Sequence, residues 1–431
     1  MAARGVVVIG AGQGGLDTAA ALRAKGYSGP VTLVGDEPVP PYHRPPLSKG
    51  FLTGATAHED LLLRPESFFE AQGISRVSGD RAQRVELDGQ RVELASGTIL
   101  AYDKLVLATG ARARVLPLPG ADLSGVLTLR SLADAETLRG HLDGPPRHVC
   151  VIGAGFVGLE LAATAHTRGH RVTVVEVQSR PLARALTPQM SAWLAGRHEE
   201  RGVRLLLGQE VAALHGGADG NVEVMELRDG RRLPADLVVV GAGALPNTRL
   251  AADAGLLVGD GVIVDRWLRT SDRAVYAIGD CARFPAPGSG RHIRLESVQN
   301  ASDQARYVAA AICGESAPYT AVPWFWSEQY ELRLQMAGLT AGHDETVTVG
   351  DPDGARFSVL CFLQGRLIGV ESVGRPADHG IARRLLAAGT GPSPAEARSP
   401  GFDLKAFVAG PGSHGSAPAH VPGQDRLSTP A

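Results

Sequence analysis

Cysteine is scarce in this sequence and never forms a close pair. The 431 residues include four cysteines, and no two of them stand in a C-x-x-C motif: Cys150, Cys281, Cys313 and Cys361. This usage argues against a dithiol redox centre and fits a reducing compartment. We therefore expect no redox-active cysteine pair in this protein.

Long apolar runs and an excess of one charge are also missing. No apolar run approaches the ~18 residues that a membrane-spanning helix needs. The first apolar run already begins at Val6, so we expect no signal peptide. The formal net charge is -2, which offers no basic field for nucleic acid. These absences predict a cytoplasmic protein whose partners include neither nucleic acid nor a membrane.

A glycine-rich fingerprint, by contrast, is present twice. Gly10-Ala11-Gly12-Gln13-Gly14-Gly15 follows the apolar run 6–9, and Gly153-Ala154-Gly155-Phe156-Val157-Gly158 follows the apolar run 149–152. Each is followed, roughly 20 residues on, by a short apolar run that ends near an acid, Asp36 in the first copy and Glu176 in the second. Strand, glycine turn, helix and acid-terminated strand make up a dinucleotide-binding βαβ unit. Two copies predict two bound dinucleotides.

Each part of the fingerprint has a physical task. The first glycine permits a tight turn, the second lets backbone N–H groups approach a pyrophosphate, and the third lets the helix pack close to the strand. The helix N-terminus then faces the negative charge. The acid accepts hydrogen bonds from a ribose diol and would repel a 2′-phosphate. Glycines that merely end buried strands are the alternative, against which the repeated βαβ context argues.

The remaining pattern predicts a mixed α/β chain of roughly two to four domains. In the first three quarters we expect a helix over 65–72, a hairpin over 84–94 that turns at Asp88-Gly89, buried strands over 104–108, 237–240 and 274–278, and a helix over 300–313. From Val322 the pattern alternates. It predicts strands over 332–336 and 346–349, a hairpin over 357–373 that turns at Gln364-Gly365, and a helix over 376–388, which together form an α+β domain.

Six motifs in fixed order carry a family resemblance. They are PPLSK at 45–49, LATG at 107–110, VIGAGFVGLE at 151–160, YAIGDC at 276–281, ESVQNA at 296–301 and VPWFWS at 322–327. With them the chain resembles the FAD-dependent ferredoxin reductases that serve bacterial oxygenase systems, such as putidaredoxin, biphenyl dioxygenase and rubredoxin reductases. The resemblance implies an α/β fold with two Rossmann-like dinucleotide-binding domains of the glutathione-reductase type and a C-terminal α+β domain.

The resemblance also implies where the domains lie. Residues 1–110 and 246–320 would form the FAD-binding domain, 111–245 the NADH-binding domain and 321–400 the C-terminal domain. Residues 401–431 are rich in Pro, Gly, Ala and Ser, and we expect this tail to be disordered. The family implies a monomer or a homodimer.

The site residues are carried over from the resemblance at the matching motifs. Lys49, Glu160 and Trp326 would lie at the reacting centre. FAD would be held by Gly10, Gly12, Gly14, Gly15, Asp36, Arg44, Lys49, Ala82, Arg130, Gly279, Asp280 and Val298. NADH would be held by Gly153, Gly155, Gly158, Glu160, Glu176 and Gly243. No metal is expected.

Two of these acids can also be argued from their surroundings. Glu160 stands among apolar residues, and a buried carboxylate needs a partner. The resemblance places Lys49 beside the flavin, able to pair with Glu160. Glu176 favours NADH over NADPH, although Arg180 and Arg184 follow closely and could contact a 2′-phosphate.

Each assignment has a plainer alternative. Asp36 and Asp280 could be turn acids, Lys49 a surface lysine and Glu160 a solvated helix residue. Arg130 could be a charge at a helix N-terminus, Arg44 an exposed loop arginine, and Trp326 part of an aromatic domain interface. Trp324 and Trp326 share one strand face by period two, and we assign Trp324 to packing.

These residues predict an oxidoreductase that links a two-electron donor to a one-electron acceptor. NADH gives up a hydride, an iron–sulfur protein accepts single electrons, and a flavin can connect the two. We expect a small ferredoxin or a rubredoxin as partner, feeding a Rieske-type oxygenase or a haem-thiolate monooxygenase. A quinone or dye reductase of the same fold is an alternative. An interaction protein of the apoptosis-inducing-factor type with little turnover is another, and it would predict basic patches or a targeting segment.

Overall fold

The computed structural model describes residues 4–286, 290–315 and 317–409. The chain divides into two compact units, of which one ends at Leu334 and the other begins at Gln335. In the described ranges, no helix is both long and apolar enough to cross a membrane.

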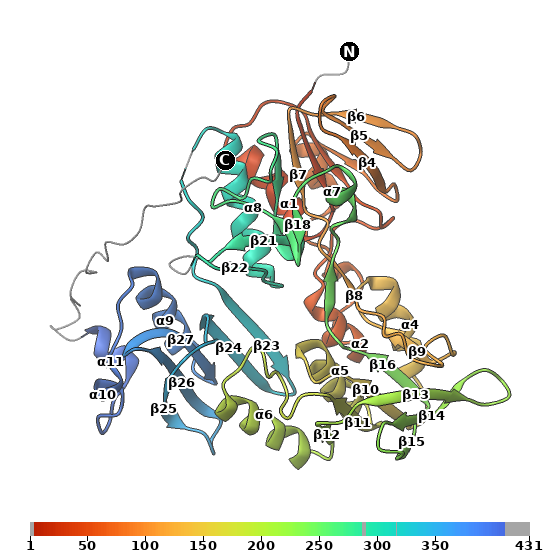
Figure 1. The fold of residues 1–431 in the computed structure, drawn as a ribbon, viewed down its shortest axis with the longest axis vertical. Helices are drawn as coiled ribbons and strands as arrows, with labels where there is room; N and C mark the ends of the chain where they lie inside the picture. The colour runs from red at the N-terminus through yellow and green to blue at the C-terminus, as the bar shows by residue number, and fades with distance from the viewer. Residues whose placement is uncertain (1–3, 287–289, 316, 410–431) are drawn as a thin grey trace, which may run out of the picture. The chain divides into compact units, whose positions relative to one another are not determined.

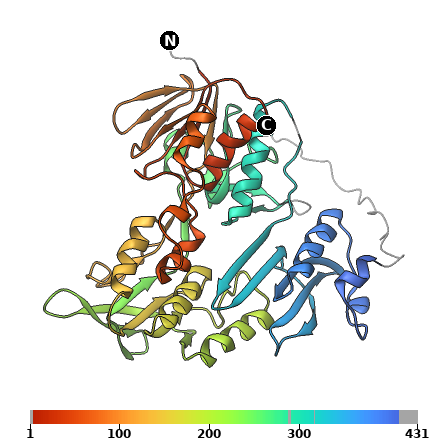
Figure 2. The ribbon, with the colours of Figure 1, turned by 180° about the vertical axis from the view of Figure 1, so that it is seen from behind.

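The first unit contains a parallel five-stranded sheet built around the first glycine turn. Its strands pair in the order β20-β7-β1-β2-β3, with the bounds Val275–Ala277, Lys104–Leu107, Val6–Ile9, Val31–Val34 and Ile74–Val77. Strands β1 and β7 are buried, as a parallel sheet covered on both faces requires. Helices α1 (Gln13–Ala24) and α8 (Val298–Ile312) lie side by side, so segments far apart in sequence share one core (Figures 1 and 2).

A second parallel five-stranded sheet is built around the second glycine turn. Its order is β12-β11-β10-β16-β9, with the bounds Arg204–Leu207, Arg171–Glu176, His148–Ile152, Leu237–Val240 and Val126–Thr128. Its helices are α4 (Leu132–Leu142), α5 (Phe156–Thr167) and α6 (Pro188–Glu200). Both sheets therefore place a glycine turn at the carboxyl end of a central strand, where α/β sheets bind ligands.

Two short strands join the regions around the two sheets. Strand β8 (Ala111–Ala113) pairs antiparallel with β17 (Ala244–Pro246). Beside this ribbon, Thr109 Oγ1 donates to the Asn247 carbonyl at 2.8 Å, and Asn247 Nδ2 donates to the Thr109 carbonyl at 2.9 Å. These hydrogen bonds hold together the two segments, 109–113 and 244–247, by which the chain passes between the two sheet regions.

Smaller elements complete the first unit. Antiparallel sheets are formed by β4 (Ala82–Glu86), β5 (Arg91–Leu94) and β6 (Ile99–Ala101), and by β13 (Val211–Gly216), β14 (Val222–Leu227) and β15 (Arg232–Pro234). A mixed sheet contains β18 (Val258–Gly259), β19 (Gly261–Ile263), β21 (Ala282–Pro285) and β22 (His292–Ile293). Short helices are η1 (Pro45–Ser48), α2 (Gly50–Thr53), η2 (Glu59–Leu61), α3 (Glu66–Ala71), α7 (Arg249–Asp253) and η3 (Gly279–Cys281), and β23 spans Trp324–Gln329.

The second unit is of α+β type. Its sheet has the order β24-β27-β26-β25, with the bounds Leu332–Gly338, Arg366–Val373, Arg356–Leu363 and Glu345–Asp351. Helix α9 (Pro376–Ala388) follows, then α10 (Pro394–Ala397) and α11 (Leu404–Ala409). The hairpin turn at Gln364-Gly365 and the helix over 376–388 are confirmed.

The predictions fail at the start of one helix and in part of the tail. Helix α8 begins at Val298, two residues before the predicted start, because Ser297 caps it by accepting from the Asn300 N–H at 3.0 Å. Within the segment predicted to be disordered, α11 forms a helix and buries Leu404 completely. The buried Leu404 side chain anchors this helix. Residues 410–431, which were also predicted to be disordered, lie outside the described ranges.

Candidate active site

The first glycine turn has the shape that a pyrophosphate requires. Gly10 has φ +110°, and a Cβ there would lie 2.1 Å from the Ala108 carbonyl oxygen. A Cβ on Gly15 would lie 1.8 Å from the Gly10 carbonyl oxygen, so helix and strand approach as closely as backbone allows. A Cβ on Gly12 would meet nothing within 4 Å. Space is therefore left open only where the second glycine faces the predicted ligand.

The second glycine turn repeats this geometry. Gly153 has φ +106°, and a Cβ there would lie 2.6 Å from the Gly241 carbonyl oxygen, while a Cβ on Gly158 would lie 2.1 Å from the Gly153 carbonyl oxygen. A Cβ on Gly155 would come no nearer than 3.9 Å to another atom. Helices α1 and α5 have no side-chain cap within the described residues and no acid in their first turns. Both N-termini can therefore present N–H groups to an anion.

The acids at the two strand ends differ in their surroundings. Asp36 is exposed beyond β2. Glu176 ends β11 and accepts two hydrogen bonds, at 2.7 Å from the Ala154 N–H in the glycine turn and at 2.8 Å from the Gln178 N–H. Glu176 is thus held against the second turn, where a ribose diol would replace or join the backbone donors.

Three of the residues predicted to hold FAD lie together. Arg130 Nη2 pairs with Asp280 Oδ2 at 2.6 Å, and Arg44 Nη1 donates to the Arg130 carbonyl at 2.7 Å. Arg44 also pairs with Glu37 at 2.5 Å, and the Tyr42 hydroxyl donates to the same carboxylate at 2.6 Å. Nothing in the sequence indicated that Glu37 belongs to this cluster, because it directly follows Asp36 and is part of none of the recognised motifs.

The start of α8 offers polar atoms that the described residues do not satisfy. Gln304 Oε1 accepts from the Gly279 N–H at 2.7 Å, beside Asp280, while Gln304 Nε2 is buried without a hydrogen-bond partner. Asn300 Oδ1 is buried in the same condition. Unsatisfied buried groups of this kind mark a place for a polar ligand or water. Together with the open Gly12 face, they fit FAD; Val298 and Gly279 lie in this region, whereas Ala82 lies in β4, packed against the first core.

Glu160 is the centre of the second cluster. It lies in α5, is only 5% exposed, and accepts hydrogen bonds on both oxygens. Oε2 accepts from Lys49 Nζ at 2.8 Å and from Ser48 Oγ at 2.6 Å, and Oε1 accepts from Ser327 Oγ at 2.6 Å. The buried carboxylate therefore has the partner that its apolar surroundings demand, and Lys49 is that partner.

Further contacts hold the segment that carries Lys49 against α5. Thr164 Oγ1 donates to the Ser48 carbonyl at 2.8 Å, and Arg168 donates to the Leu52 carbonyl. Ser48 and Thr164 are buried. The ion pair thus bridges the region of the first glycine turn and the helix of the second.

Aromatic side chains of β23 accompany this cluster. The rings of Trp324 and Trp326 lie 5.6 Å apart between centroids, as two residues on one strand face should, and Phe325 packs against Phe156 at 4.5 Å. The backbone N–H of Trp324 donates to Gln299 Oε1 at 3.0 Å. Strand β23 therefore contacts both α8 and α5, and Trp326 on this strand is half-buried.

Ser48 and Ser327 are site residues that the sequence reasoning missed. Both lie inside motifs that were recognised, PPLSK and VPWFWS. The available signal was the demand of the buried Glu160 carboxylate for more than one donor, since one ammonium leaves an oxygen unsatisfied. Which hydroxyls meet it depends on tertiary packing.

The cysteines have the environment of inert thiols. All four are free, and Cys150, Cys281 and Cys361 are buried. Burial raises the pKa of Cys150 to about 12 and also raises the pKa of Cys281, which stands next to Asp280. A thiol with a raised pKa is a poor nucleophile. Thiol chemistry therefore has no support at either cluster.

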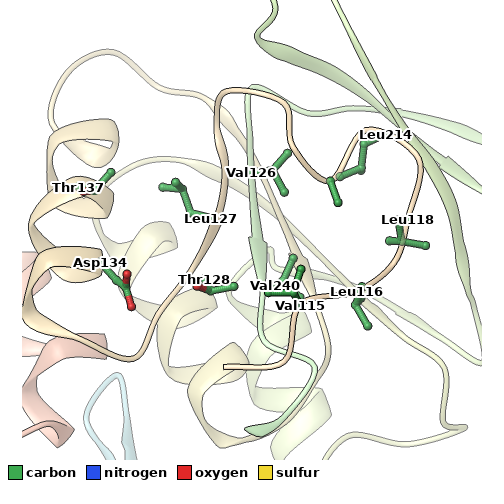
Figure 3. A pocket seen from close by; sticks show the side chains of 11 residues that line it. Val115, Leu116, Leu118, Val126, Leu127, Thr128, Asp134, Thr137, Leu214 and Val240 are labelled. Carbon is green, nitrogen blue, oxygen red and sulfur yellow. The ribbon is translucent and has the colours of Figure 1, made fainter. Parts of the chain in front are cut away.

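A pocket in the second region lies beside the Arg130 cluster, because its lining residue Asp134 accepts from the Arg130 backbone N–H at 2.9 Å. Its lining is mostly apolar and comes from the segment 115–121 and from β9, α4, β13 and β16, with Thr128, Asp134 and Thr137 as its polar residues (Figure 3). It includes none of the predicted site residues. The lining includes the Asp134 carboxylate and no lysine or arginine, so this pocket does not suit a pyrophosphate.

Two family models match the chain. The model described as pyridine nucleotide-disulphide oxidoreductase matches residues 4–305, and the model described as reductase C-terminal matches residues 324–408. Rhodocoxin reductase of Rhodococcus erythropolis is 50% identical over 404 residues, which are 94% of this chain and 94% of that protein.

Solved structures are similar along nearly the whole chain. The ferredoxin reductase for the CYP199A2 system from Rhodopseudomonas palustris superposes with a TM-score of 0.91 at 46% identity, covering 93% of this chain and 98% of the other. The reductase in a covalent putidaredoxin reductase–putidaredoxin complex gives a TM-score of 0.90 at 38% identity, with coverages of 94% and 98%.

Proposed function

We propose that this chain, which belongs to the pyridine nucleotide-disulphide oxidoreductase family, carries electrons from NADH through FAD to a small iron–sulfur protein. The observation that carries the proposal is the buried Lys49–Glu160 ion pair. One partner comes from the region of the first glycine turn and the other from the helix of the second, so the pair marks where two bound dinucleotides would meet.

The first region has the features that a resident FAD requires. The open face at Gly12 would admit the pyrophosphate of FAD. The Arg130–Asp280 pair would position the part of FAD that joins the phosphate to the flavin ring. Buried Asn300 Oδ1 and Gln304 Nε2 would gain a polar partner. We therefore assign FAD to this region, with Gly10, Gly15 and Val298 shaping its walls.

The second region has the features that an exchanging NADH requires. Gly155 leaves the open face for the pyrophosphate, and Glu176 stands at the end of β11 beside Ala154. A carboxylate at this place binds a ribose diol and repels a 2′-phosphate. Arg180 donates to the carbonyls of Leu186 and Ala183, so this arginine is already engaged away from such a phosphate. These contacts favour NADH over NADPH.

FAD, when bound, supplies the chemistry that accepts a hydride and releases electrons singly. The residues of the chain orient and shield that chemistry. The Glu160 carboxylate would face the nicotinamide side, and the Lys49 ammonium would place positive charge beside the flavin. Trp326 and Phe325 would limit water at this place. Absent a low-pKa thiol at either cluster, electrons would leave without a disulfide intermediate.

The acceptor that we propose is a small ferredoxin, with a rubredoxin as the second candidate. The support is the similarity to reductases whose names specify such partners. The electrons would then serve an oxygenase, either of the Rieske type or a haem-thiolate monooxygenase. We place the enzyme in the cytoplasm, in accord with four free cysteines.

Stopped-flow reduction of the purified yellow protein tests this function. We expect NADH to bleach the flavin absorbance rapidly and NADPH to do so more slowly. Cytochrome c reduction by NADH should then depend on an added ferredoxin or rubredoxin. A colourless protein overturns the FAD assignment. Slow bleaching by NADH with no ferredoxin-dependent cytochrome c reduction would favour an interaction protein with little turnover.

A further inference from the structure

A line of buried hydrogen bonds leads from Glu160 away from the proposed cofactor sites. Ser327 Oγ donates to Glu160 Oε1 at 2.6 Å, and Gln329 Nε2 donates to Ser327 Oγ at 3.2 Å. Gln329 Oε1 in turn lies 2.7 Å from His198 Nε2. The line connects α5 to α6 through alternate residues of β23, and all four residues belong to the first unit.

The proton positions along this line follow from its first member. A carboxylate only accepts hydrogen bonds, so the Ser327 hydroxyl must donate to Glu160. The Ser327 oxygen is then free to accept from the Gln329 amide nitrogen, which turns the amide oxygen toward His198. That oxygen can only accept, so His198 must carry its proton on Nε2.

The far end of the line is consistent with that tautomer. His198 Nδ1 lies 3.4 Å from the Tyr330 hydroxyl, which can donate to an unprotonated nitrogen. Burial lowers the pKa of His198; the hydrogen bond to Gln329 acts in the opposite direction, and Arg201 nearby lowers the pKa further. Both contacts suit a neutral imidazole, with a donor at Nε2 and an acceptor at Nδ1.

The line is fully enclosed. Ser327 and His198 are 0% exposed and Gln329 is 2% exposed. In such surroundings an unsatisfied polar atom is costly, so reversal of one hydrogen bond is opposed by all the others. Tyr330 adopts φ +56°, unfavourable for a tyrosine, and its ring is held by the Arg201 guanidinium 4.6 Å from the centroid. Tyr330 is the first of the two turn residues between β23 and β24, where a positive φ is usual.

We infer that His198 and Gln329 are positioning residues for Glu160. The Gln329 amide holds the Ser327 oxygen at the place from which its hydroxyl donates to Oε1, which leaves Oε2 to Lys49 and Ser48. The orientation of the carboxylate is thus set from α6 as well as from the Lys49 segment. The consequence for hydride transfer rests on the function proposed above, whereas the hydrogen-bond line itself does not.

Nitrogen-15 NMR of histidine-labelled, FAD-loaded protein tests the line directly. The His198 resonances are identified among 13 histidines by their loss in His198→Phe. We expect a protonated Nε2 and an unprotonated Nδ1 in the wild type. In Ser327→Ala the Gln329 amide loses its constraint and can turn its NH2 group toward His198. The His198 shifts should then move toward the Nδ1-protonated tautomer.

His170 provides the internal control for this measurement. It is also buried, its Nδ1 accepts from the Arg147 N–H at 3.2 Å, and its Nε2 lies 3.0 Å from the Leu142 carbonyl. Its shifts should not respond to Ser327→Ala. A wild-type His198 protonated on Nδ1, or His198 shifts that are the same in Ser327→Ala and wild type, would overturn the inference.

Stopped-flow kinetics test the consequence. His198→Phe removes the donor to Gln329, and we expect a roughly tenfold lower rate constant for flavin reduction at saturating NADH, with a nearly unchanged Kd for NADH. His198→Gln keeps an N–H donor and should restore most of the rate. Equal rates in the two variants contradict the positioning role. Failure of wild-type reduction by NADH would instead overturn the proposed function and leave the NMR result standing.

Discussion

Glu160 and Glu176 are carboxylates of the same βαβ unit, yet their surroundings suit opposite tasks. Glu160 is buried and accepts from three side chains, each of which is fixed by the fold. Glu176 is half-buried and accepts only from two backbone N–H groups at the edge of the glycine turn. The Glu160 carboxylate keeps its side-chain partners. The Glu176 carboxylate is partly open to solvent, where a ribose diol could donate to it.

Substitution of Glu176 tests its part in cofactor choice. Glu176→Ala removes the acceptor for the ribose diol and the charge that repels a 2′-phosphate. We expect the Kd for NADH to rise about tenfold, as for loss of one to two hydrogen bonds, and the NADH/NADPH preference to fall. Stopped-flow titration with both nucleotides measures the two changes. Glu226→Ala, on β14, should leave the preference intact; an unaltered preference in Glu176→Ala would remove Glu176 from this role.

Substitution of Lys49 tests the energetic part of the buried pair. Lys49→Met leaves the Glu160 charge with only two serine donors, so we expect the free energy of unfolding to fall by about 1–3 kcal/mol. Lys25→Met is the matched control, because Lys25 pairs with a Glu315 side chain that is 64% exposed, and it should cost less than about 1 kcal/mol. Chemical denaturation measures both.

The double variant separates pairing from packing. In a Glu160→Gln background the charge is absent, so Lys49→Met should cost clearly less than it does alone. Equal costs in the two backgrounds would mean that Lys49 stabilises the fold by its aliphatic stem and not by its charge.

At the scale of elements, the two βαβ units share one design in their turns and differ in their helices. The third glycine of each turn brings the helix against the strand, and the second leaves open space. The helices differ at equivalent positions. Asp17 in α1 accepts from Gln13 Nε2 and Ser302 Oγ, close to α8, whereas Glu160 in α5 accepts from Lys49. The same backbone motif therefore carries an acid bound to neighbouring polar side chains in one copy and, in the other, an acid paired with Lys49 at the proposed reacting centre.

The second glycine of each turn can be tested by adding one methyl group. Gly12→Ala meets no protein atom within 4 Å, so the protein should fold but be purified without FAD. Gly155→Ala should keep FAD and bind NADH at least tenfold more weakly. The flavin absorbance per protein and the NADH titration are the measurements.

Gly196→Ala is the control for these glycine variants. Gly196 lies within α6 with nothing within 4 Å of a Cβ, and alanine there should raise the free energy of unfolding by about 1 kcal/mol. Its flavin content should equal that of the wild type. A Gly12→Ala protein that retains stoichiometric FAD would contradict the proposed position of the pyrophosphate.

At the scale of the whole molecule, FAD is expected to be part of the folded structure. A ligand that binds only the native state adds about 4 kcal/mol when its concentration is a thousand times its Kd. Removal of FAD should therefore lower the melting temperature, and its return should restore it. Calorimetry of the stripped and reloaded protein measures this shift. Added FAD should not stabilise Gly12→Ala, and coincident melting curves for stripped and loaded wild type would argue against a resident flavin.

Local patterns in the sequence were sufficient for the strand and helix at each glycine turn and for the hairpin and helix near the end of the described chain, but not for shorter strands such as β8, β9 and β12. The glycine turns were predictable because φ values of +110° and +106° at Gly10 and Gly153 exclude most other residues. The hairpin turn at Gln364-Gly365 was predictable because alternation on both sides of a turn dipeptide is a local signal. Helix α11 was not predictable in this way, because the burial of Leu404 depends on what the helix packs against.

The sequence by itself determined that the chain has two dinucleotide-binding βαβ units, because strand, turn and helix are encoded within about 30 consecutive residues. Only the tertiary structure decided which side chains meet at the proposed reacting centre. Ser48, Lys49, Glu160 and Ser327 lie far apart along the chain and converge on one buried carboxylate. The line from that carboxylate to His198 was likewise invisible, because hydrogen-bond direction is a property of the packed assembly and not of any single residue.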